Sequence, residues 1–279
     1  MDKKALLFLH ALSPLHPGVG QGVGAVDLPV AREKATGIPY LPGSSLKGVL
    51  RDEARAWPKE EVAAVFGPET EAAHEHAAAL QVGDAKLLLL PVRSLYGLFA
   101  YATSPYLLTR FRREAELVGR PAPQVTEPGE KALLAPKSRL NGEGVLYLED
   151  LDLPVEELEA VQAWENYLAP LDLPIQGRLA VLPDNVMAFL LETATEVVAR
   201  IRLEDDKKTV AQGALWYEEN LPAETLLYAL LRAERARNGQ DLSAEGILAK
   251  VKGLLERPLQ LGGKATVGRG LCRTVLWGV

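Results

Sequence analysis

Two serines followed by basic residues form the first group of side chains that could do chemistry. They lie in the segment 42–51, Pro-Gly-Ser-Ser-Leu-Lys-Gly-Val-Leu-Arg. Its apolar residues share one helical face, so a helix is expected to begin at or next to Ser44. A helix N-terminus exposes N–H groups that suit a phosphate, and the hydroxyls of Ser44 and Ser45 add donors. Lys47 and Arg51 extend the positive charge along one side. The segment predicts a phosphate site; the plainer alternative is a capped helix with a solvated basic face.

A glycine-rich segment near the C-terminus is the second candidate. Residues 261–270 read Leu-Gly-Gly-Lys-Ala-Thr-Val-Gly-Arg-Gly, and two of the glycines have the spacing of a P-loop. Arg269 stands where the P-loop lysine would be, and a strand is expected to follow, so a free-standing nucleotide phosphatase is disfavoured. We expect instead that the backbone at Gly262 and Gly263 approaches a polyanion closely, with Lys264 and Arg269 supplying charge.

Alternating strand and helix patterns must position these segments. Apolar runs predict strands at 4–12, at two places within 85–101, and at 144–149, 178–182 and 271–277. Amphipathic stretches predict helices from about 44 to 57 and at 105–118, 155–168, 185–193, 223–236 and 243–255, with Asp184 as a plausible cap. A polar helical excursion is expected at 60–80 and a loop at 119–143. Because no linker divides these elements, the sequence predicts one α+β domain over 1–279, ferredoxin-like at its centre.

Two insertions are expected in this domain. The first is a helical region at 55–82. The second is a β-hairpin at 197–218, because residues 197–203 alternate between apolar side chains and a face that carries arginines. The residues Asp-Asp-Lys-Lys at 205–208 provide its turn.

Composition restricts the class of protein further. The 279 residues are 48% hydrophobic and 24% charged, which is typical of a folded globular chain. An N-terminal apolar run of about nine residues is too short for a membrane span, so we expect a cytoplasmic protein without a membrane partner. The single cysteine, Cys272, excludes an internal disulfide framework. The net charge of −6 is unusual for a nucleic-acid binder, but basic residues gather locally and permit a basic groove on an acidic body.

The two candidate phosphate segments together resemble the paired signatures of the RAMP superfamily, whose members bind CRISPR RNA on an RRM-like core. Further stretches narrow the resemblance to the multi-copy backbone subunits of the type III-B, or Cmr, effector complexes. These stretches are residues 16–18, 26–33, 82–86, 91–95, 195–201 and 213–219. The resemblance covers almost the whole chain and is loosest at 119–175.

This resemblance implies both an architecture and a set of partners. The architecture is a ferredoxin-like, RRM-like palm with a protruding thumb, which is the hairpin 197–218. Copies of the chain would stack in a filament along a CRISPR guide RNA, beside other Cmr subunits, and cleave a complementary single-stranded target RNA at regular intervals. The residues that would hold the guide backbone are Ser44, Ser45, Lys47, Arg51, Gly262, Gly263, Lys264 and Arg269.

The resemblance also implies a catalytic group. In such subunits target cleavage depends on a divalent metal, Mg²⁺ or Mn²⁺, and on an aspartate that corresponds to Asp27. RNA carries its own nucleophile, the 2′-hydroxyl, so Asp27 could accept its proton or hold a hydrated metal ion, and the sequence leaves both roles open. His16 and Glu218 are candidate auxiliary groups. Asn220 stands where the family often has a tyrosine, which weakens a catalytic role for the thumb base. The alternative is a non-catalytic guide-binding scaffold in which Asp27 is structural.

Overall fold

The computed structural model describes residues 2–20, 26–69, 76–203 and 210–278. Its central sheet contains β1 (Lys3–Ala11), β4 (Ala85–Arg93), β12 (Leu226–Ala233) and β14 (Leu271–Trp277) in the order β14-β1-β12-β4. Neighbouring strands in this group are antiparallel. Short strands extend it at β2 (Tyr40–Leu41), β3 (Leu80–Val82) and β13 (Leu259–Gln260).

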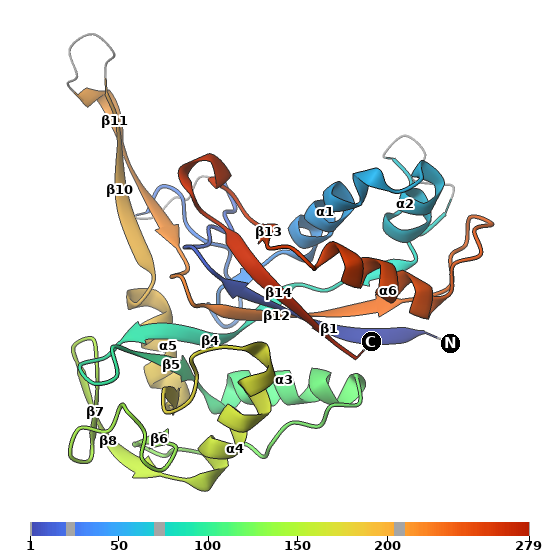
Figure 1. The fold of residues 1–279 in the computed structure, drawn as a ribbon. Helices are drawn as coiled ribbons and strands as arrows, with labels where there is room; N and C mark the ends of the chain where they lie inside the picture. Colours follow the sequence, from blue (N-terminus) through green and yellow to red (C-terminus); the bar gives the residue numbers. More distant parts are fainter. Residues whose placement is uncertain (1, 21–25, 70–75, 204–209, 279) are drawn as a thin grey trace.

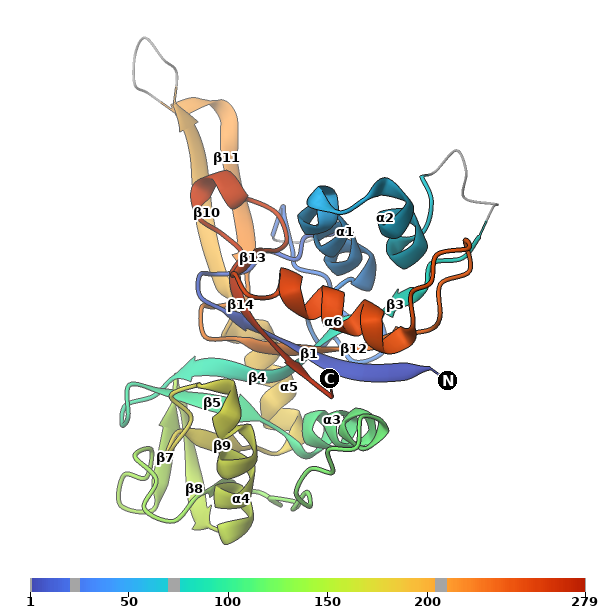
Figure 2. The same ribbon diagram turned by 45° about the vertical axis from the view of Figure 1, so that its right-hand side comes forward.

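Helices cover both faces of this sheet. On one face lie α1 (Gly43–Glu53), α2 (Lys59–Phe66) and α6 (Ala244–Leu254), and on the other lie α3 (Pro105–Leu117) and α4 (Glu159–Leu168) (Figures 1 and 2). Side chains of a strand alternate between faces, so in β1 Leu7 and Leu9 join the cluster under α1 and α6, while Leu6 and Phe8 join the cluster toward α3. Burial on both faces explains the continuous apolar run in the sequence.

A long insertion between β4 and β12 widens the sheet. It adds β5 (Phe99–Thr103), β6 (Ala132–Leu134), β7 (Val145–Leu148), β8 (Leu151–Glu157) and β9 (Leu179–Val181) in the order β5-β9-β6-β8-β7. The pairs β5/β9 and β6/β8 are parallel, so the sheet as a whole is mixed. The insertion also contains α5 (Asp184–Thr193), and short 3₁₀ turns occur at Ala54–Ala56, Ala169–Leu171 and Ala265–Val267. The protein is therefore a mixed α/β fold with one large sheet. In the described parts of the chain, no helix has both the length and the apolar character to cross a membrane.

The predicted hairpin is confirmed as a separate two-stranded sheet. It consists of β10 (Glu196–Leu203) and β11 (Val210–Asn220), and it projects away from the main sheet (Figure 1). The turn expected at 205–208 lies outside the described residues. One face of the hairpin leaves apolar side chains exposed, and these are Val197, Ile201, Leu215 and Tyr217. The other face pairs Arg200 with Trp216 in register.

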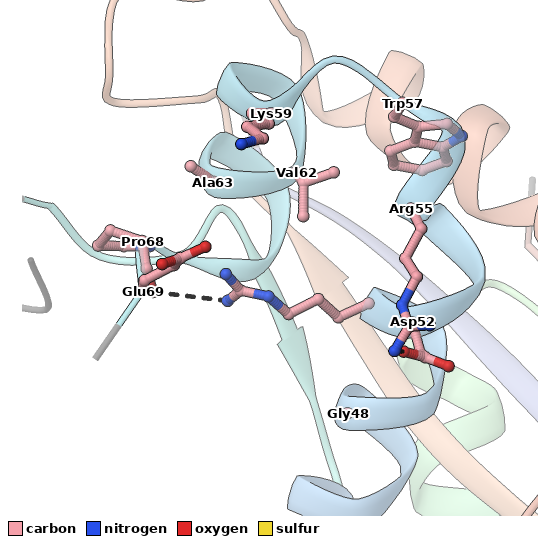
Figure 3. Close-up of a pocket in the computed structure, with 10 residues that line it drawn as sticks. Gly48, Asp52, Arg55, Trp57, Lys59, Val62, Ala63, Pro68 and Glu69 are labelled. Carbon is pink, nitrogen blue, oxygen red and sulfur yellow. Dashed lines mark hydrogen bonds and ion pairs between the residues drawn. The ribbon is translucent and has the colours of Figure 1, made fainter. Parts of the chain in front are cut away.

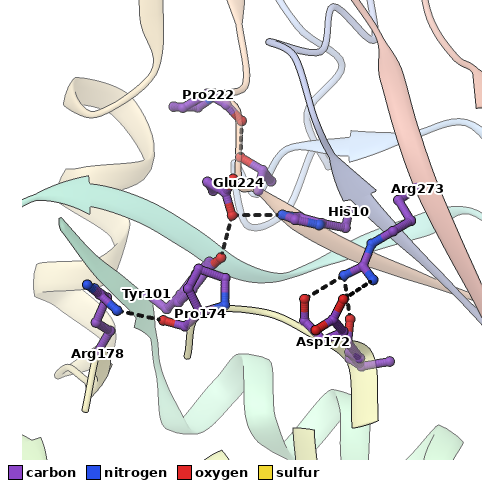
Figure 4. A network of polar contacts seen from close by, with 10 residues as sticks. His10, Tyr101, Asp172, Pro174, Arg178, Pro222, Glu224 and Arg273 are labelled. Atoms are coloured by element: carbon purple, nitrogen blue, oxygen red, sulfur yellow. Dashed lines mark hydrogen bonds and ion pairs between the residues drawn. The ribbon is translucent and has the colours of Figure 1, made fainter. Parts of the chain in front are cut away.

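A polar cluster fastens the returning end of the hairpin to the main sheet (Figure 4). Glu224, just before β12, adopts a left-handed φ of 73°, which is unusual for a residue with a side chain. Its carboxylate contacts His10 Nε2 at 2.8 Å and accepts a hydrogen bond from the Tyr101 hydroxyl at 2.7 Å. Burial, with the nearby Glu224 carboxylate, raises the pKa of Tyr101, so its hydroxyl keeps its proton into more alkaline solution than an ordinary tyrosine does. The cluster thus joins β1, β5 and the β11–β12 turn.

Several predicted elements are wrong in type or extent. The segment predicted as helix 223–236 is β12, a central strand, because its leucines are buried on both faces and therefore show no strand alternation. In the predicted helix 155–168, β8 continues to Glu157 before α4 begins. The loop expected at 119–143 contains β6. The helical region at 55–82 is reduced, in its described part, to a 3₁₀ turn and α2, followed by β3.

The predicted role of Asp184 as a cap of its own helix is also wrong. Pro183 occupies the N-cap position of α5, and Asp184 is the first helical residue. The Asp184 carboxylate instead accepts the amide of Tyr106, in the first turn of α3, at 3.1 Å. One carboxylate therefore connects the N-termini of α3 and α5, which sequence neighbours alone could not indicate.

Replacing Glu165 by glutamine is expected to change the stability of the protein more favourably at neutral pH than at acid pH. The fully buried Glu165 carboxylate accepts the amide of Leu179 at 3.2 Å, and desolvation outweighs this and neighbouring hydrogen bonds, so its pKa is raised. A raised acid pKa gives stability that is present at low pH and lost as pH rises through the folded-state pKa. Glutamine keeps an oxygen acceptor and does not ionise. The free energy of unfolding of variant and wild type is measured in urea at pH 4 and pH 7. The difference, variant minus wild type, should be more positive at pH 7. An equal difference at both pH values would contradict this.

Candidate nucleic-acid interface

The N-terminus of α1 lies directly against the backbone before β4. A Cβ on Gly43 would lie 2.6 Å from the carbonyl oxygen of Val82, so only glycine permits this approach. The Gly43 amide donates to Asp84 Oδ1 at 2.7 Å. Ser44 and Ser45 are exposed, and neither side chain caps the helix, which begins at Gly43 as expected. The Asp84 carboxylate is thus hydrogen-bonded to the first amide of the helix. The two serines that follow are exposed to solvent.

The glycine-rich segment meets α1 at one cavity. Ser45 and Gly48 of α1 line a cavity of about 410 Å³ together with Gly262 and Gly263. The two segments that the sequence singled out, 217 residues apart, therefore converge. Gly262 has φ of 70°, and a Cβ there would lie 2.5 Å from the carbonyl oxygen of His16. The Gly263 amide donates to that same oxygen at 2.9 Å, which fixes this wall of the cavity.

The basic residues of α1 differ in their surroundings. Lys47 is half-buried, and desolvation, followed by the charge of Arg51, lowers its pKa. The Arg51 guanidinium donates to the carbonyl oxygen of Gly67 at 2.9 Å and so holds the C-terminal end of α2. Arg51 lines a separate cavity of about 630 Å³ with Trp57 and Lys59 (Figure 3). Gly48 lines both cavities, so the two are neighbours on the surface of α1.

The basic residues of the glycine-rich loop are paired with acids of the hairpin. Lys264 Nζ lies 3.1 Å from Glu218 Oε1, and Arg269 Nη1 lies 3.9 Å from Glu196 Oε2. Lys264 itself has a left-handed φ of 66°. The loop is followed by β14, which agrees with the expectation that it is not a P-loop. These ion pairs join the loop to the base of the hairpin.

Glu218 is buried in a complete set of donors. Besides Lys264, its carboxylate accepts from Trp216 Nε1 at 2.8 Å and from Arg200 Nε at 3.3 Å. Burial alone would raise the pKa of Glu218, but the hydrogen bonds from Trp216 and Lys264 outweigh it and hold the pKa below its ordinary value. The group is therefore ionised at neutral pH and cannot serve there as a proton donor. Its contacts are those of a residue that holds the loop and hairpin together.

His16 is buried and its ring is enclosed. Its Nδ1 lies 2.6 Å from the carbonyl oxygen of Glu219, and because a carbonyl can only accept, Nδ1 carries the hydrogen. A Cβ on Gly18 would lie 2.5 Å from His16 Nε2, so the other ring nitrogen packs against the chain at Gly18. The imidazole therefore links residues 16–18 to β11.

Asp27 is exposed and lies beside the base of the hairpin. Its Oδ2 accepts the amide of Tyr217 at 2.8 Å, and the Leu28 amide donates to the Tyr217 carbonyl oxygen at 3.0 Å. Leu28 and Glu218 form a parallel bridge. The segment that carries Asp27 therefore runs alongside β11, and the exposed carboxylate is hydrogen-bonded there through Oδ2. Within the described residues, no group of three or more His, Cys, Asp or Glu side chains is placed to hold a metal ion.

Two residues with clear contacts at this site were not singled out from the sequence. Asp84 binds the first amide of α1, and Glu219 contacts the segment after Asp27. Both lie in stretches that carried the family resemblance, 82–86 and 213–219. The available signal was the presence of an acid beside a glycine and of paired glutamates, but only the three-dimensional contacts distinguish Glu219 from Glu218.

Comparison with known proteins defines the class to which this fold and cavity belong. Residues 8–273 match the family model of the RAMP superfamily. That match spans the central sheet, the hairpin and both segments at the cavity. The chain therefore belongs to the RAMP superfamily.

Similarity to individual proteins assigns the chain to a particular family within the superfamily. It is 40% identical to the CRISPR system Cmr endoribonuclease Cmr4 of Pyrococcus furiosus, with 98% of this chain and 96% of that protein aligned. A crystal structure of oligomeric Cmr4 from the same organism superposes with a TM-score of 0.74 at 33% identity, covering 98% of this chain and 97% of the other. A chain of the type III-B Cmr-β complex bound to cognate target RNA, at 22% identity, shares the fold with a TM-score of 0.78 over 98% and 96% of the two chains. Within the superfamily this is a Cmr4-family protein.

Proposed function

We propose that this chain is a repeated backbone subunit of a type III-B CRISPR ribonucleoprotein that binds guide RNA and cleaves complementary target RNA. The observation that carries the proposal is the meeting of the α1 N-terminus and the glycine-rich loop at one cavity, with the Asp27 segment on the adjoining hairpin base. The Pyrococcus furiosus relative, named as an endoribonuclease, and the oligomeric crystal structure of Cmr4 support this activity and assembly.

The guide backbone is proposed to follow the cavity between α1 and the glycine-rich loop. The four-stranded group β14-β1-β12-β4 with α1 and α6 is then a ferredoxin-like palm, and the hairpin β10–β11 is the thumb. A phosphate there would meet Ser45, which lines the cavity, with the exposed Ser44 beside it in the same turn, since Asp84 already takes the amide of Gly43. Gly262 and Gly263 let the RNA approach the opposite wall without side-chain contact.

Target cleavage is proposed to depend on Asp27. The 2′-hydroxyl of RNA is the internal nucleophile, so the protein must align it and accept its proton. An exposed carboxylate whose Oδ2 is fixed by the Tyr217 amide presents Oδ1 in a defined direction. In this proposal the buried His16, through Nδ1, and the buried Glu218, through its three donors, act by holding neighbouring segments in place. A scaffold without cleavage is the competing function.

The donor set limits how a divalent metal could take part. Asp27 offers one carboxylate, and the described residues supply no cluster of three potential ligands around it. That set suits a hydrated Mg²⁺ or Mn²⁺ ion that RNA phosphates help to bind, because Mg²⁺ commonly keeps several waters and uses one or two carboxylates. When bound, the ion would supply positive charge to the phosphate.

Reversing the charge of Lys47 is expected to weaken guide binding without any sequence preference. The contact is to phosphate, so Lys47→Glu should reduce the slope of log affinity against log salt concentration by about one. Fluorescence anisotropy with two unrelated RNA sequences across a salt series measures both effects. Lys252→Glu, an exposed charge reversal in the last turn of α6, is the matched control and should bind as the wild type does. Unchanged affinity of Lys47→Glu at low salt would contradict the phosphate path.

Co-purification tests the function as a whole. The tagged chain is expressed with the products of its neighbouring genes, and RNA that remains bound after a salt wash is sequenced. Repeat-derived guides in an assembly that contains several copies of the chain are the expected result. An assembly that forms but holds no RNA would contradict the proposal.

A further inference from the structure

The Asp27 segment is held against the hairpin by one buried side chain. Glu219 is 6% exposed, and its carboxylate accepts hydrogen bonds from three different places in the chain. The Val30 amide donates to Oε2 at 3.0 Å, the Thr195 hydroxyl donates to Oε1 at 2.9 Å, and the Arg32 guanidinium also binds Oε1.

The backbone of Glu219 is engaged as well. Its amide donates to the Leu28 carbonyl oxygen at 3.0 Å, and its carbonyl oxygen accepts from His16 Nδ1 at 2.6 Å. His16 in turn accepts the Gly263 amide through its own carbonyl oxygen. One residue therefore contacts the segment after Asp27, the start of the hairpin, and the loop that borders the glycine-lined cavity.

We propose that Glu219 is the positioning residue for Asp27. This inference rests on the proposed function, because it concerns the same cleavage site. The bond to the Val30 amide is decisive, because Val30 is buried and its amide loses this hydrogen bond if the carboxylate is removed. The segment would then leave β11 to satisfy that amide, and Asp27 would lose its fixed relation to Tyr217. Glu218, on the opposite face of β11, cannot replace it, because adjacent residues of a strand point to opposite sides.

The test compares Glu219→Ala with Glu219→Gln in the assembled, guide-loaded complex. Three quantities are measured: the single-turnover rate of target cleavage, the affinity for target RNA, and hydrogen exchange of peptides covering 26–33. For Glu219→Ala we expect a rate about 100-fold lower with target affinity nearly unchanged, because misplacing a reacting group affects the chemical step. Exchange at Val30 should become faster. Glutamine retains an acceptor for the Val30 amide, so Glu219→Gln should recover part of the rate and of the protection.

The control is Glu192→Ala, which removes an exposed carboxylate on α5 and should change none of the three quantities. Unchanged exchange at Val30 in Glu219→Ala would overturn the inference, and so would a rate loss fully explained by less assembled complex. Failure of the proposed function is a separate result. If Asp27→Asn cleaves normally the catalytic assignment fails, while hydrogen exchange still reports whether Glu219 holds the segment.

Discussion

Asp27→Asn is expected to slow target cleavage by at least about 100-fold while guide and target binding persist. Asparagine keeps an oxygen that can accept the Tyr217 amide, so the segment remains docked on β11. It removes the negative charge and the basicity needed to accept a proton or to bind a cation. Loss of a positioned acid–base group lowers rates by about 100- to 10,000-fold. Single-turnover cleavage of labelled target RNA by the assembled complex measures the loss.

The matched control for this variant is Asp241→Asn, which removes an aspartate whose side chain is 93% exposed. That complex should cleave at the wild-type rate. A regular ladder of products from Asp27→Asn complexes would show that the chain is a scaffold and that another subunit or residue cuts the target. Asp27→Ala extends the comparison, because it removes the docking bond as well as the charge.

Gly262→Ala is expected to reduce guide affinity strongly. The residue has a left-handed φ of 70°, and the added Cβ would lie 2.5 Å from the carbonyl oxygen of His16. To avoid this clash the loop must move away from His16. That movement breaks the hydrogen bond between the Gly263 amide and the His16 carbonyl oxygen and changes the cavity. Strain of about 1–3 kcal/mol corresponds to roughly 5- to 150-fold in an equilibrium constant. Guide binding by the purified chain, measured at fixed salt, should fall within that range.

Gly253→Ala provides the control for this substitution. Gly253 is a helical residue of α6, and a Cβ there would meet no heavy atom within 4 Å. Alanine favours a helix over glycine by about 1 kcal/mol, so this variant should unfold at a slightly higher temperature and bind guide RNA normally. If Gly262→Ala bound guide RNA as well as Gly253→Ala, the glycine-lined wall would not be part of the RNA path.

Sequence patterns were informative where a local rule applied. The hairpin followed from the alternation in 197–203, and the start of α1 next to Ser44 followed from the serine pair before its apolar face. They failed at β12, where Leu-Leu-Tyr-Ala-Leu-Leu-Arg-Ala lies in the middle of a sheet covered by helices on both faces. Burial on both faces removes the period that distinguishes a strand from a helix, and the leucines favour a helix by propensity.

The candidate site shows the same division. The sequence by itself predicted a helix that begins next to Ser44 and a close backbone approach at Gly262, because a helix terminus and a backbone turn are properties of short segments. Only the tertiary structure decided that Lys264 and Arg269 are paired with Glu218 and Glu196, and that Glu219 holds the Asp27 segment. Those partners come from distant parts of the chain, and a carboxylate's role depends on which donors the fold brings to it.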